Sequence, residues 1–140
     1  MGMTAILLVS FCVYSVIGWT IDTAHRSYQA GRFARGGFSR FPFSPIYGFG
    51  ALLAIAMAPF LRQWPLWAEG LAYVLVMGAY EYASGVIVVR TLRRRLWDYT
   101  GEFMAINGHT SPVYALIWGL LSLFLVHIMH PFLLRSLAAI

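Results

Sequence analysis

The sequence contains no lysine, a single cysteine and only five acidic residues among 140. A P-loop nucleotide-binding site is excluded because the lysine of that motif is missing. Cys12 has no second cysteine to pair with, so neither an intramolecular disulfide nor a cysteine-based zinc site can form. No serine lies in a G-x-S-x-G sequence, which argues against an acyl-transfer enzyme. These absences favour a protein that is not an enzyme, and we assign it no catalytic residue, metal site or cofactor.

The residues that are present are mostly apolar. Hydrophobic residues make up 60% of the chain and charged residues 11%, and the mean hydropathy is +0.71. This composition is typical of an integral membrane protein. The apolar runs indicate an all-α polytopic protein, a single transmembrane domain over residues 1–140, with a bundle of about four membrane-spanning helices at 3–21, 44–61, 66–89 and 113–134.

The second of these runs is the weakest. It is only just long enough to cross a bilayer, and it contains two glycines and Pro59. Such a run predicts a bent or closely packed helix. The alternative is a re-entrant segment, which leaves three full crossings.

The positive charges predict the orientation of the chain. All ten basic residues are arginines, and eight of them lie in or beside the long loops 23–43 and 90–112. The positive-inside rule therefore places both loops in the cytoplasm and both termini outside. Membrane orientation accounts for the net charge of +5, so we expect the partner to be the lipid bilayer and no nucleic acid.

Two carboxylates fall inside the third apolar run, where an ionisable group costs roughly 2.5–3.5 kcal/mol. Glu69 lies near one end of its helix, and we expect it to be solvated at the interface, as we do His127 and His130. Glu81 lies about 18 Å deeper along the same helix. It must face protein or a wet cavity, either for function or in a structural pair with a loop arginine such as Arg35 or Arg90.

Asp22 and Asp98 are expected at the cytoplasmic level of the membrane. Asp22 ends the first apolar run, and Asp98 lies in a Trp-Asp-Tyr sequence. They are candidates for an acidic lining shared with Glu81. The alternative for both is capping of a helix or loop and pairing with arginine.

Several short sequences occur together in one order along residues 11–119. They are Tyr14-Ser15, Gly18-Trp19 followed by Asp22, Arg35-Gly36-Gly37-Phe38, Pro45-Ile46-Tyr47-Gly48-Phe49-Gly50, Glu81-Tyr82 with Ser84-Gly85, Trp97-Asp98-Tyr99, Asn107-Gly108 and Trp118-Gly119. With these sequences the chain resembles the ABC-transporter type IV permease family, small bacterial membrane proteins also called CmpB-like. The family usually has glutamate in place of Asp22 and arginine in place of His109.

The resemblance implies a permease-like subunit in the bacterial inner membrane that works with an ATPase or another transporter subunit. The candidate substrate-binding residues lie mostly in these sequences: Glu81, Asp22, Asp98, Tyr82, Tyr47, Trp19, Asn107, Arg35 and Trp97. Two alternatives remain: a small proton-coupled homodimeric exporter that uses the buried glutamate, and a membrane enzyme or binding protein that handles lipid phosphates at the cytoplasmic face. Four crossings enclose little space, so we also expect a homo-oligomer, most simply a homodimer.

Overall fold

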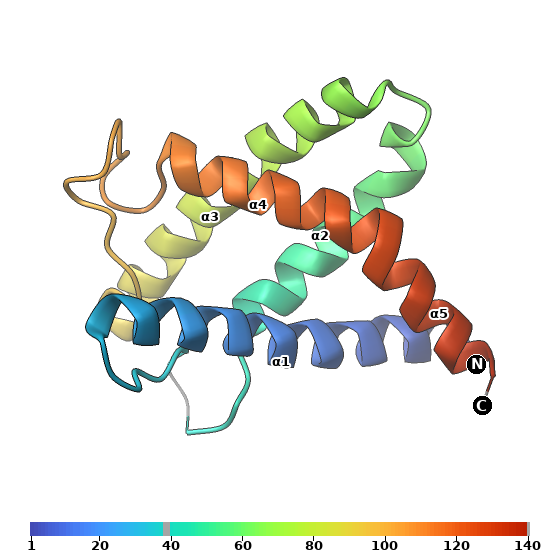
Figure 1. The fold of residues 1–140 in the computed structure, drawn as a ribbon, viewed down its shortest axis with the longest axis horizontal. Helices are drawn as coiled ribbons and strands as arrows, with labels where there is room; N and C mark the ends of the chain where they lie inside the picture. The colour runs from blue at the N-terminus through green and yellow to red at the C-terminus, as the bar shows by residue number, and fades with distance from the viewer. Residues whose placement is uncertain (38–39, 140) are drawn as a thin grey trace. The chain divides into compact units, whose positions relative to one another are not determined.

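The computed structural model describes residues 1–37 and 40–139, which form helices joined by loops (Figure 1). In chain order the helices are α1 (Met3–Ala30), α2 (Pro45–Leu61), α3 (Leu66–Leu92), α4 (Pro112–Phe124), the π-helix η1 (Leu125–Met129) and α5 (His130–Ala138). The only β-type pairing in the described residues is an isolated bridge between Ile106 and Thr110. The predicted all-α class is confirmed.

Three helical segments are long and apolar enough to cross a membrane: Met3–Ala30, Leu66–Leu92 and Pro112–Ala138. The third joins α4, η1 and α5 into one continuous segment. Helix α2 is apolar but has only 17 residues, about 26 Å at 1.5 Å per residue. That is short of the roughly 30 Å hydrocarbon core. The chain is thus a multi-pass membrane protein, and whether α2 crosses or re-enters stays a prediction.

Helix α1 is longer than the sequence indicated. We predicted its end at residue 21 and a loop from Thr23, but the helix continues to Ala30. Asp22 and Arg26 form an ion pair one helical turn apart, with 3.1 Å between carboxylate and guanidinium. After Gly18 the helix contains no glycine or proline before Gly31, whose φ of 62° ends it in the left-handed conformation. The polar residues 22–30 continue the helix beyond the apolar run 3–21. The change in composition at residue 22 therefore predicted the wrong C-terminal end of the helix.

Contacts divide the chain into two compact units. The first contains Met1–Leu53 and the segment from Phe132 onward. The second contains Ala54–Pro131, and therefore the end of α2, all of α3, the following loop, α4 and η1. Each unit carries its own polar cluster, and each is described by itself below.

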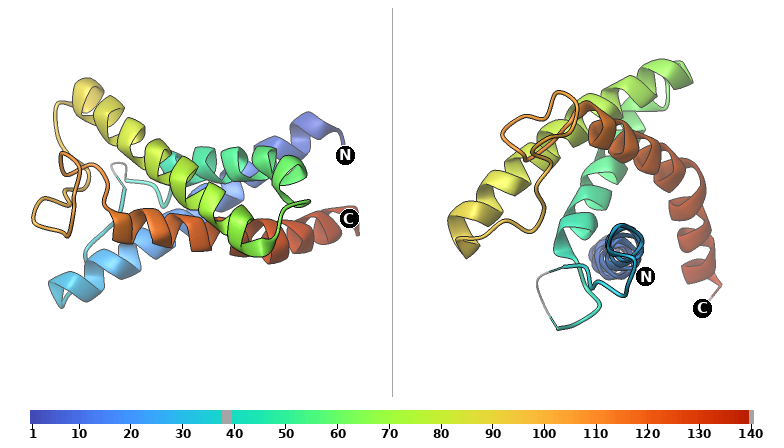
Figure 2. Two further views of the ribbon diagram at one scale, coloured as in Figure 1. Left: turned by 90° about the horizontal axis from the view of Figure 1, so that it is seen from above. Right: turned by 60° about the vertical axis from the view of Figure 1, so that its left-hand side comes forward.

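In the second unit, α3 and α4 run in opposite directions and cross closely (Figure 2). Glycines allow the approach. A Cβ on Gly78 would lie 3.0 Å from the Cβ of Ala115, and a Cβ on Gly119 would overlap Val74, with its backbone N at 3.0 Å. Small residues at such crossings let helix backbones come together without a gap. This crossing positions the side chains of α3 and α4 that meet at the end of the pair next to the loop.

Candidate functional site

Glu81 lies at the centre of the polar cluster of the second unit. It is 3% exposed, and its carboxylate accepts three hydrogen bonds from side chains. The Tyr99 hydroxyl and the Trp118 indole N–H both donate to Oε1, at 2.8 and 3.0 Å, and the Thr110 hydroxyl donates to Oε2 at 2.7 Å. A hydrogen bond to a charged acceptor contributes about 1.5–3 kcal/mol. Three such bonds offset much of the cost of burying the carboxylate.

All three donors are neutral. Among the described residues Glu81 forms no ion pair, and the two arginines considered as partners, Arg35 and Arg90, are exposed. The predicted alternative of a structural pair with Arg90 is therefore wrong, and a pair with Arg35, which belongs to the other unit, stays a prediction. The reason is geometric: the neutral side chains of the loop and of α4 occupy the positions around both carboxylate oxygens.

This arrangement suits either protonation state of Glu81. Oε1 can remain an acceptor for Tyr99 and Trp118 whether or not the carboxyl group is protonated. A proton on Oε2 would be donated to the Thr110 hydroxyl, which can accept as well as donate. An arginine partner has no acceptor and would hold the carboxylate in its charged form. The side chain can therefore take up a proton without the breaking of a salt bridge.

Two of the three donors, Tyr99 and Thr110, belong to the loop between α3 and α4, residues 93–111. This loop ends in a tight turn at Asn107 and Gly108, both with positive φ (53° and 72°). Asn-Gly is the preferred pair for a type I′ turn, in which both central residues have positive φ. The His109 N–H donates to the Ile106 carbonyl at 3.0 Å across the turn. The turn returns the chain so that Thr110 reaches Glu81.

Further hydrogen bonds hold the loop in shape. The Arg95 guanidinium donates twice to the Asn107 carbonyl, both at 3.0 Å, and the Asn107 amide donates to the Tyr82 hydroxyl at 2.9 Å. The Trp97 indole donates to the His109 carbonyl at 2.9 Å. The Tyr99 ring stacks on Tyr114 of α4, with 3.7 Å between centroids. The loop is thus a folded cover over Glu81, visible beside the ends of α3 and α4 in Figure 2.

Asp98 is exposed and does not line the buried cluster. It accepts hydrogen bonds from the Thr100 hydroxyl at 2.5 Å and the Thr100 N–H at 2.9 Å, and Arg95 lies 3.7 Å away. The Thr100 hydroxyl, then the Thr100 N–H and the charge of Arg95 lower the pKa of Asp98 below its usual value. Asp98 therefore has the contacts of the predicted alternative, because it caps the loop at Thr100 and pairs with Arg95.

His109 makes the folded loop sensitive to pH. Burial, together with the charge of Arg95, lowers the pKa of His109 below its usual value of about 6.5. A group whose pKa is lowered by folding contributes stability that is present above the unfolded pKa and is lost as the pH falls. We therefore expect the loop to lose protection from amide hydrogen exchange as the pH falls from 7.5 to 5.5, after correction for intrinsic exchange rates.

The matched control is His109→Gln, which does not titrate in this range. In this variant the backbone amides of Ile106 and of residue 109, both hydrogen-bonded in the loop, should keep the same protection factors at the two pH values. Equal pH dependence in the native protein and the variant would show that His109 is not the titrating group.

Thr110 provides the only donor to Oε2 among the described residues. Thr110→Val keeps the shape and removes that donor, and an unsatisfied buried acceptor costs about 1–3 kcal/mol. We expect a clearly lower thermal unfolding midpoint, measured by tryptophan fluorescence in detergent. Thr91→Val, at an exposed position near the end of α3, is the control and should change the midpoint little. If both variants unfold alike, the Thr110 hydroxyl contributes nothing to the burial of Glu81.

The first unit has its own polar cluster, in which the loop after α1 folds back on that helix. The Gly36 N–H donates to the Thr23 hydroxyl at 2.9 Å, and the Gly37 N–H donates to Asp22 Oδ2 at 3.1 Å. The Trp19 indole donates to the Gly36 carbonyl at 3.1 Å, and the Arg35 guanidinium lies 5.8 Å from the Trp19 ring centroid. Asp22, Trp19 and Arg35 therefore fix the start of the loop on α1.

Tyr47 and Asp22 have structural roles that the sequence left open. Tyr47 packs against Gly18, where any Cβ would overlap the tyrosine side chain. Asp22 pairs with Arg26 and accepts a hydrogen bond from the Gly37 N–H, as expected of a capping group. Phe38, which belongs to the quoted Arg-Gly-Gly-Phe sequence, lies outside the described residues. The shared membrane level of Asp22 and Asp98 stays a prediction.

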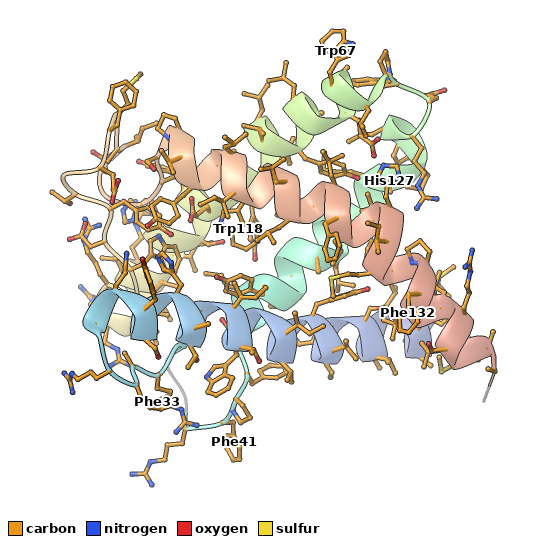
Figure 3. All side chains as sticks on the ribbon, in the orientation of Figure 1. Phe33, Phe41, Trp67, Trp118, His127 and Phe132 are labelled. Carbon is orange, nitrogen blue, oxygen red and sulfur yellow. The ribbon has the colours of Figure 1, made fainter. Side chains whose placement is uncertain are left out.

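Glu69 differs most from expectation. We predicted a solvated interface residue, but its side chain is 2% exposed, and both of its oxygens lie 3.0–3.1 Å from Nε2 of His127. His127 itself is exposed, as expected, but its ring also pairs with Glu69. The two residues are 58 positions apart, so only the antiparallel packing of α3 against the α4–η1 segment brings them together. Figure 3 labels His127 on that segment.

The structure thus gathers four of the sequence candidates, Glu81, Tyr82, Trp97 and Asn107, at the loop end of α3. It also shows three contacts of Glu81 that were not in the candidate set: Tyr99, Thr110 and Trp118. One sequence signal pointed to Trp118. An indole N–H within an apolar helix needs an acceptor, and the carboxylates of Glu69 and Glu81 are the charged acceptors in the apolar runs.

Comparison with known families gives one match. The family model described as "Putative ABC-transporter type IV" matches residues 9–140 of the chain. No curated protein and no solved structure matches it.

Proposed function

We propose that this chain, which belongs to the ABC-transporter type IV family, is the permease-like membrane subunit of a transport system and works with partner chains. Membership of the family together with the three span-length helices makes it a transport-related membrane protein. Glu81 is the group that responds to the transported ion or substrate. Tyr82, Trp97 and Asn107 hold the loop that covers it through their hydrogen bonds, and Asp98 braces the same loop.

One observation carries the proposal: a buried carboxylate in a membrane helix has only neutral donors. A structural carboxylate in lipid is normally paired with a cation, whereas one that binds a proton or a cationic group in turn needs partners that it can exchange. Tyr99, Thr110 and Trp118 are such partners, because each holds the carboxylate through one hydrogen bond and none adds charge.

The loop 93–111 acts as the gate. Because Tyr99 and Thr110 both come from it, a cation reaches Glu81 only after the loop has moved away from α3 and α4. Displacement gives up the Tyr99–Tyr114 stack and two hydrogen bonds to Glu81. A partner chain that docks on the loop can supply the free energy for this movement.

A cross-linking experiment tests the dependence on a partner. A photoreactive amino acid at Arg94, which is exposed in the loop, is activated in native membranes with and without ATP. We expect a cross-link to an ATP-hydrolysing subunit whose yield changes with ATP. The same label at Trp67, exposed at the start of α3, is the control for non-specific capture. No ATP-dependent cross-link at Arg94 would contradict the proposal.

The proton-coupled exporter is the second candidate, and the absence of a cation beside Glu81 in the described residues favours it as well. It requires no ATPase. Purified protein in vesicles that carry a pH gradient and no nucleotide would then release protons when a lipophilic cation such as tetraphenylphosphonium is added. Proton movement under these conditions that is lost in Glu81→Gln would favour the exporter over the ATP-dependent subunit as the function of this chain.

We also propose that the loops after α1 and α3 face the cytoplasm of a bacterial inner membrane, as the distribution of arginines indicates. In a Cys12→Ala background, a cysteine at Thr100 should be protected from impermeant thiol reagents added to intact cells. A cysteine at Gln63, in the turn before α3, should be labelled. Both positions are exposed, so labelling at Thr100 and not at Gln63 would reverse the orientation.

A second copy of the chain is part of the proposal. Four helices enclose little more than one layer of side chains, so a hydrated path needs surfaces from another chain. The mass of the purified protein in nanodiscs distinguishes the cases. A dimer supports a shared path, and a strict monomer that still transports contradicts it.

A further inference from the structure

Glu69, in the first turn of α3, and His127 form a second polar site, about 18 Å along the helix from Glu81. Nε2 of His127 lies 3.1 Å from Oε1 and 3.0 Å from Oε2 of the carboxylate. The Glu69 side chain is 2% exposed and that of His127 is 41% exposed. The imidazole therefore connects a buried acid to the surroundings. Nothing in the proposed function uses this pair.

The backbone around His127 is unusual. Leu125–Met129 form a π-helix between α4 and α5, and the His130 N–H donates to the Leu125 carbonyl, five residues earlier. Pro131 gives a physical reason. Its nitrogen has no hydrogen to donate, and in a regular α-helix its ring would clash with the carbonyl of His127. A single π-turn is a common way for a helix to accommodate such a residue, and such turns are frequent at functional sites.

The π-turn leaves one carbonyl without a helical donor. The Val126 oxygen would receive its π-type hydrogen bond from the nitrogen of residue 131, which is a proline. Nη2 of Arg62, from the turn between α2 and α3, donates to it instead at 2.7 Å. A cationic side chain thus completes the irregular turn, and the turn presents His127 to α3.

We infer that Glu69 and His127 form a proton-binding site, assembled by the π-turn that Pro131 imposes. The bound proton makes the imidazole cationic, and its attraction to Glu69 holds the π-turn against α3. When the proton leaves, His127 remains as a neutral hydrogen-bond donor, and its attraction to Glu69 weakens. The site goes beyond the proposed function, because Glu81 lies about 18 Å away along the helix. It gives α3 one proton-responsive carboxylate in its first turn and another near its middle.

The other titratable and charged groups around this pair come from each element that packs there. Tyr73 of α3 interacts electrostatically with both Glu69 and Arg62. Its hydroxyl donates to the Ala54 carbonyl of α2 at 3.1 Å. His130, at the start of α5, feels the charge of Arg62. Arg62 opposes a second positive charge nearby. Glu69 is the acidic group within hydrogen-bond distance of His127 among the described residues.

Nitrogen NMR of histidine-labelled protein in nanodiscs tests the site directly. We follow the His127 ring through a pH titration in the native protein, in Glu69→Gln and in Pro131→Ala. An opposite charge within about 4–6 Å favours the charged form of a group by roughly one to three powers of ten. His127 should therefore bind its proton at least tenfold more weakly in Glu69→Gln. It should do so in Pro131→Ala as well, because a regular helix no longer presents the ring to α3.

Glu81→Gln is the matched control, since it neutralises the other carboxylate of the same helix and should leave the His127 titration unchanged. A His127 titration that is the same in Glu69→Gln as in the native protein would overturn the site. A change in Glu69→Gln without one in Pro131→Ala would overturn the role of the π-turn.

A second readout does not depend on how Pro131→Ala folds. Loss of the pair in Glu69→Gln should speed exchange of the His130 amide, which bonds to Leu125, by tenfold or more at neutral pH. Unchanged exchange would show that the pair does not hold the turn. None of these readouts requires transport activity, so failure here leaves the proposed function of Glu81 untouched.

Discussion

Glu81→Gln is expected to abolish transport while the protein remains folded and inserted in the membrane. The amide oxygen of glutamine can accept from Tyr99 and Trp118, and its NH₂ group can donate to the Thr110 hydroxyl. The variant therefore reproduces the protonated form of Glu81 and cannot release a proton or bind a cation. Rescue of a gene-deletion strain should fall to the level of the empty vector, and the thermal unfolding midpoint should stay within about 3 °C of the native value.

Two results would contradict this expectation. A variant that rescues growth fully would remove Glu81 from the mechanism. A variant that loses many degrees of thermal stability would show that the negative charge itself holds the bundle together, which the neutral donors do not suggest. Glu102→Gln, which removes an exposed carboxylate of the loop, is the matched control and should leave both activity and stability unchanged.

Gly119→Ala is expected to destabilise the α3–α4 pair strongly. An added Cβ overlaps the Val74 side chain and lies 3.0 Å from the Val74 backbone N and 3.1 Å from its Cα. Backbone atoms inside a membrane helix cannot move aside cheaply, so the two helices must separate. Overpacking of this kind costs about 1–3 kcal/mol, which corresponds to a fall of roughly 4–10 °C in the unfolding midpoint.

Gly70→Ala at the same helix interface is the control. Its Cβ would meet only the flexible end of Leu123, at 3.2 Å, and alanine favours a helix over glycine by about 1 kcal/mol. Little loss of stability is expected there. Equal changes in the unfolding midpoint for the two substitutions would contradict the close approach of α3 and α4 at Gly119.

The sequence was sufficient to predict the membrane class and the burial of Glu81. Apolar runs near membrane length predicted α2 and the start of α3 to within a residue, because lipid requires each crossing to be both helical and apolar. The position of Glu81 within such a run predicted that it is buried. These inferences need only local composition and a helical rise, and both are properties of the chain itself.

The partners of the carboxylates were not predictable in the same way. Trp118 and Glu81 are 37 residues apart, and His127 and Glu69 are 58 apart. Such pairs depend on how α4 crosses α3, on where the Asn107–Gly108 turn returns the loop, and on the π-turn before Pro131. The burial of Glu69 was missed because distance from the helix end indicates depth in the membrane and does not show what packs on the side chain.

The central claim is that the loop 93–111 must move for Glu81 to act, and a reversible cross-link tests it most directly. A Cβ on Gly85 lies 3.1 Å from the Cβ of His109, close to the 3.5–4.5 Å that a disulfide spans. In a Cys12→Ala background, Gly85→Cys with His109→Cys would tie the loop to α3 under oxidising conditions. We predict that the oxidised protein is inactive and that reduction restores activity to the level of the single-cysteine variants. An oxidised, fully cross-linked protein that keeps this activity would contradict the account.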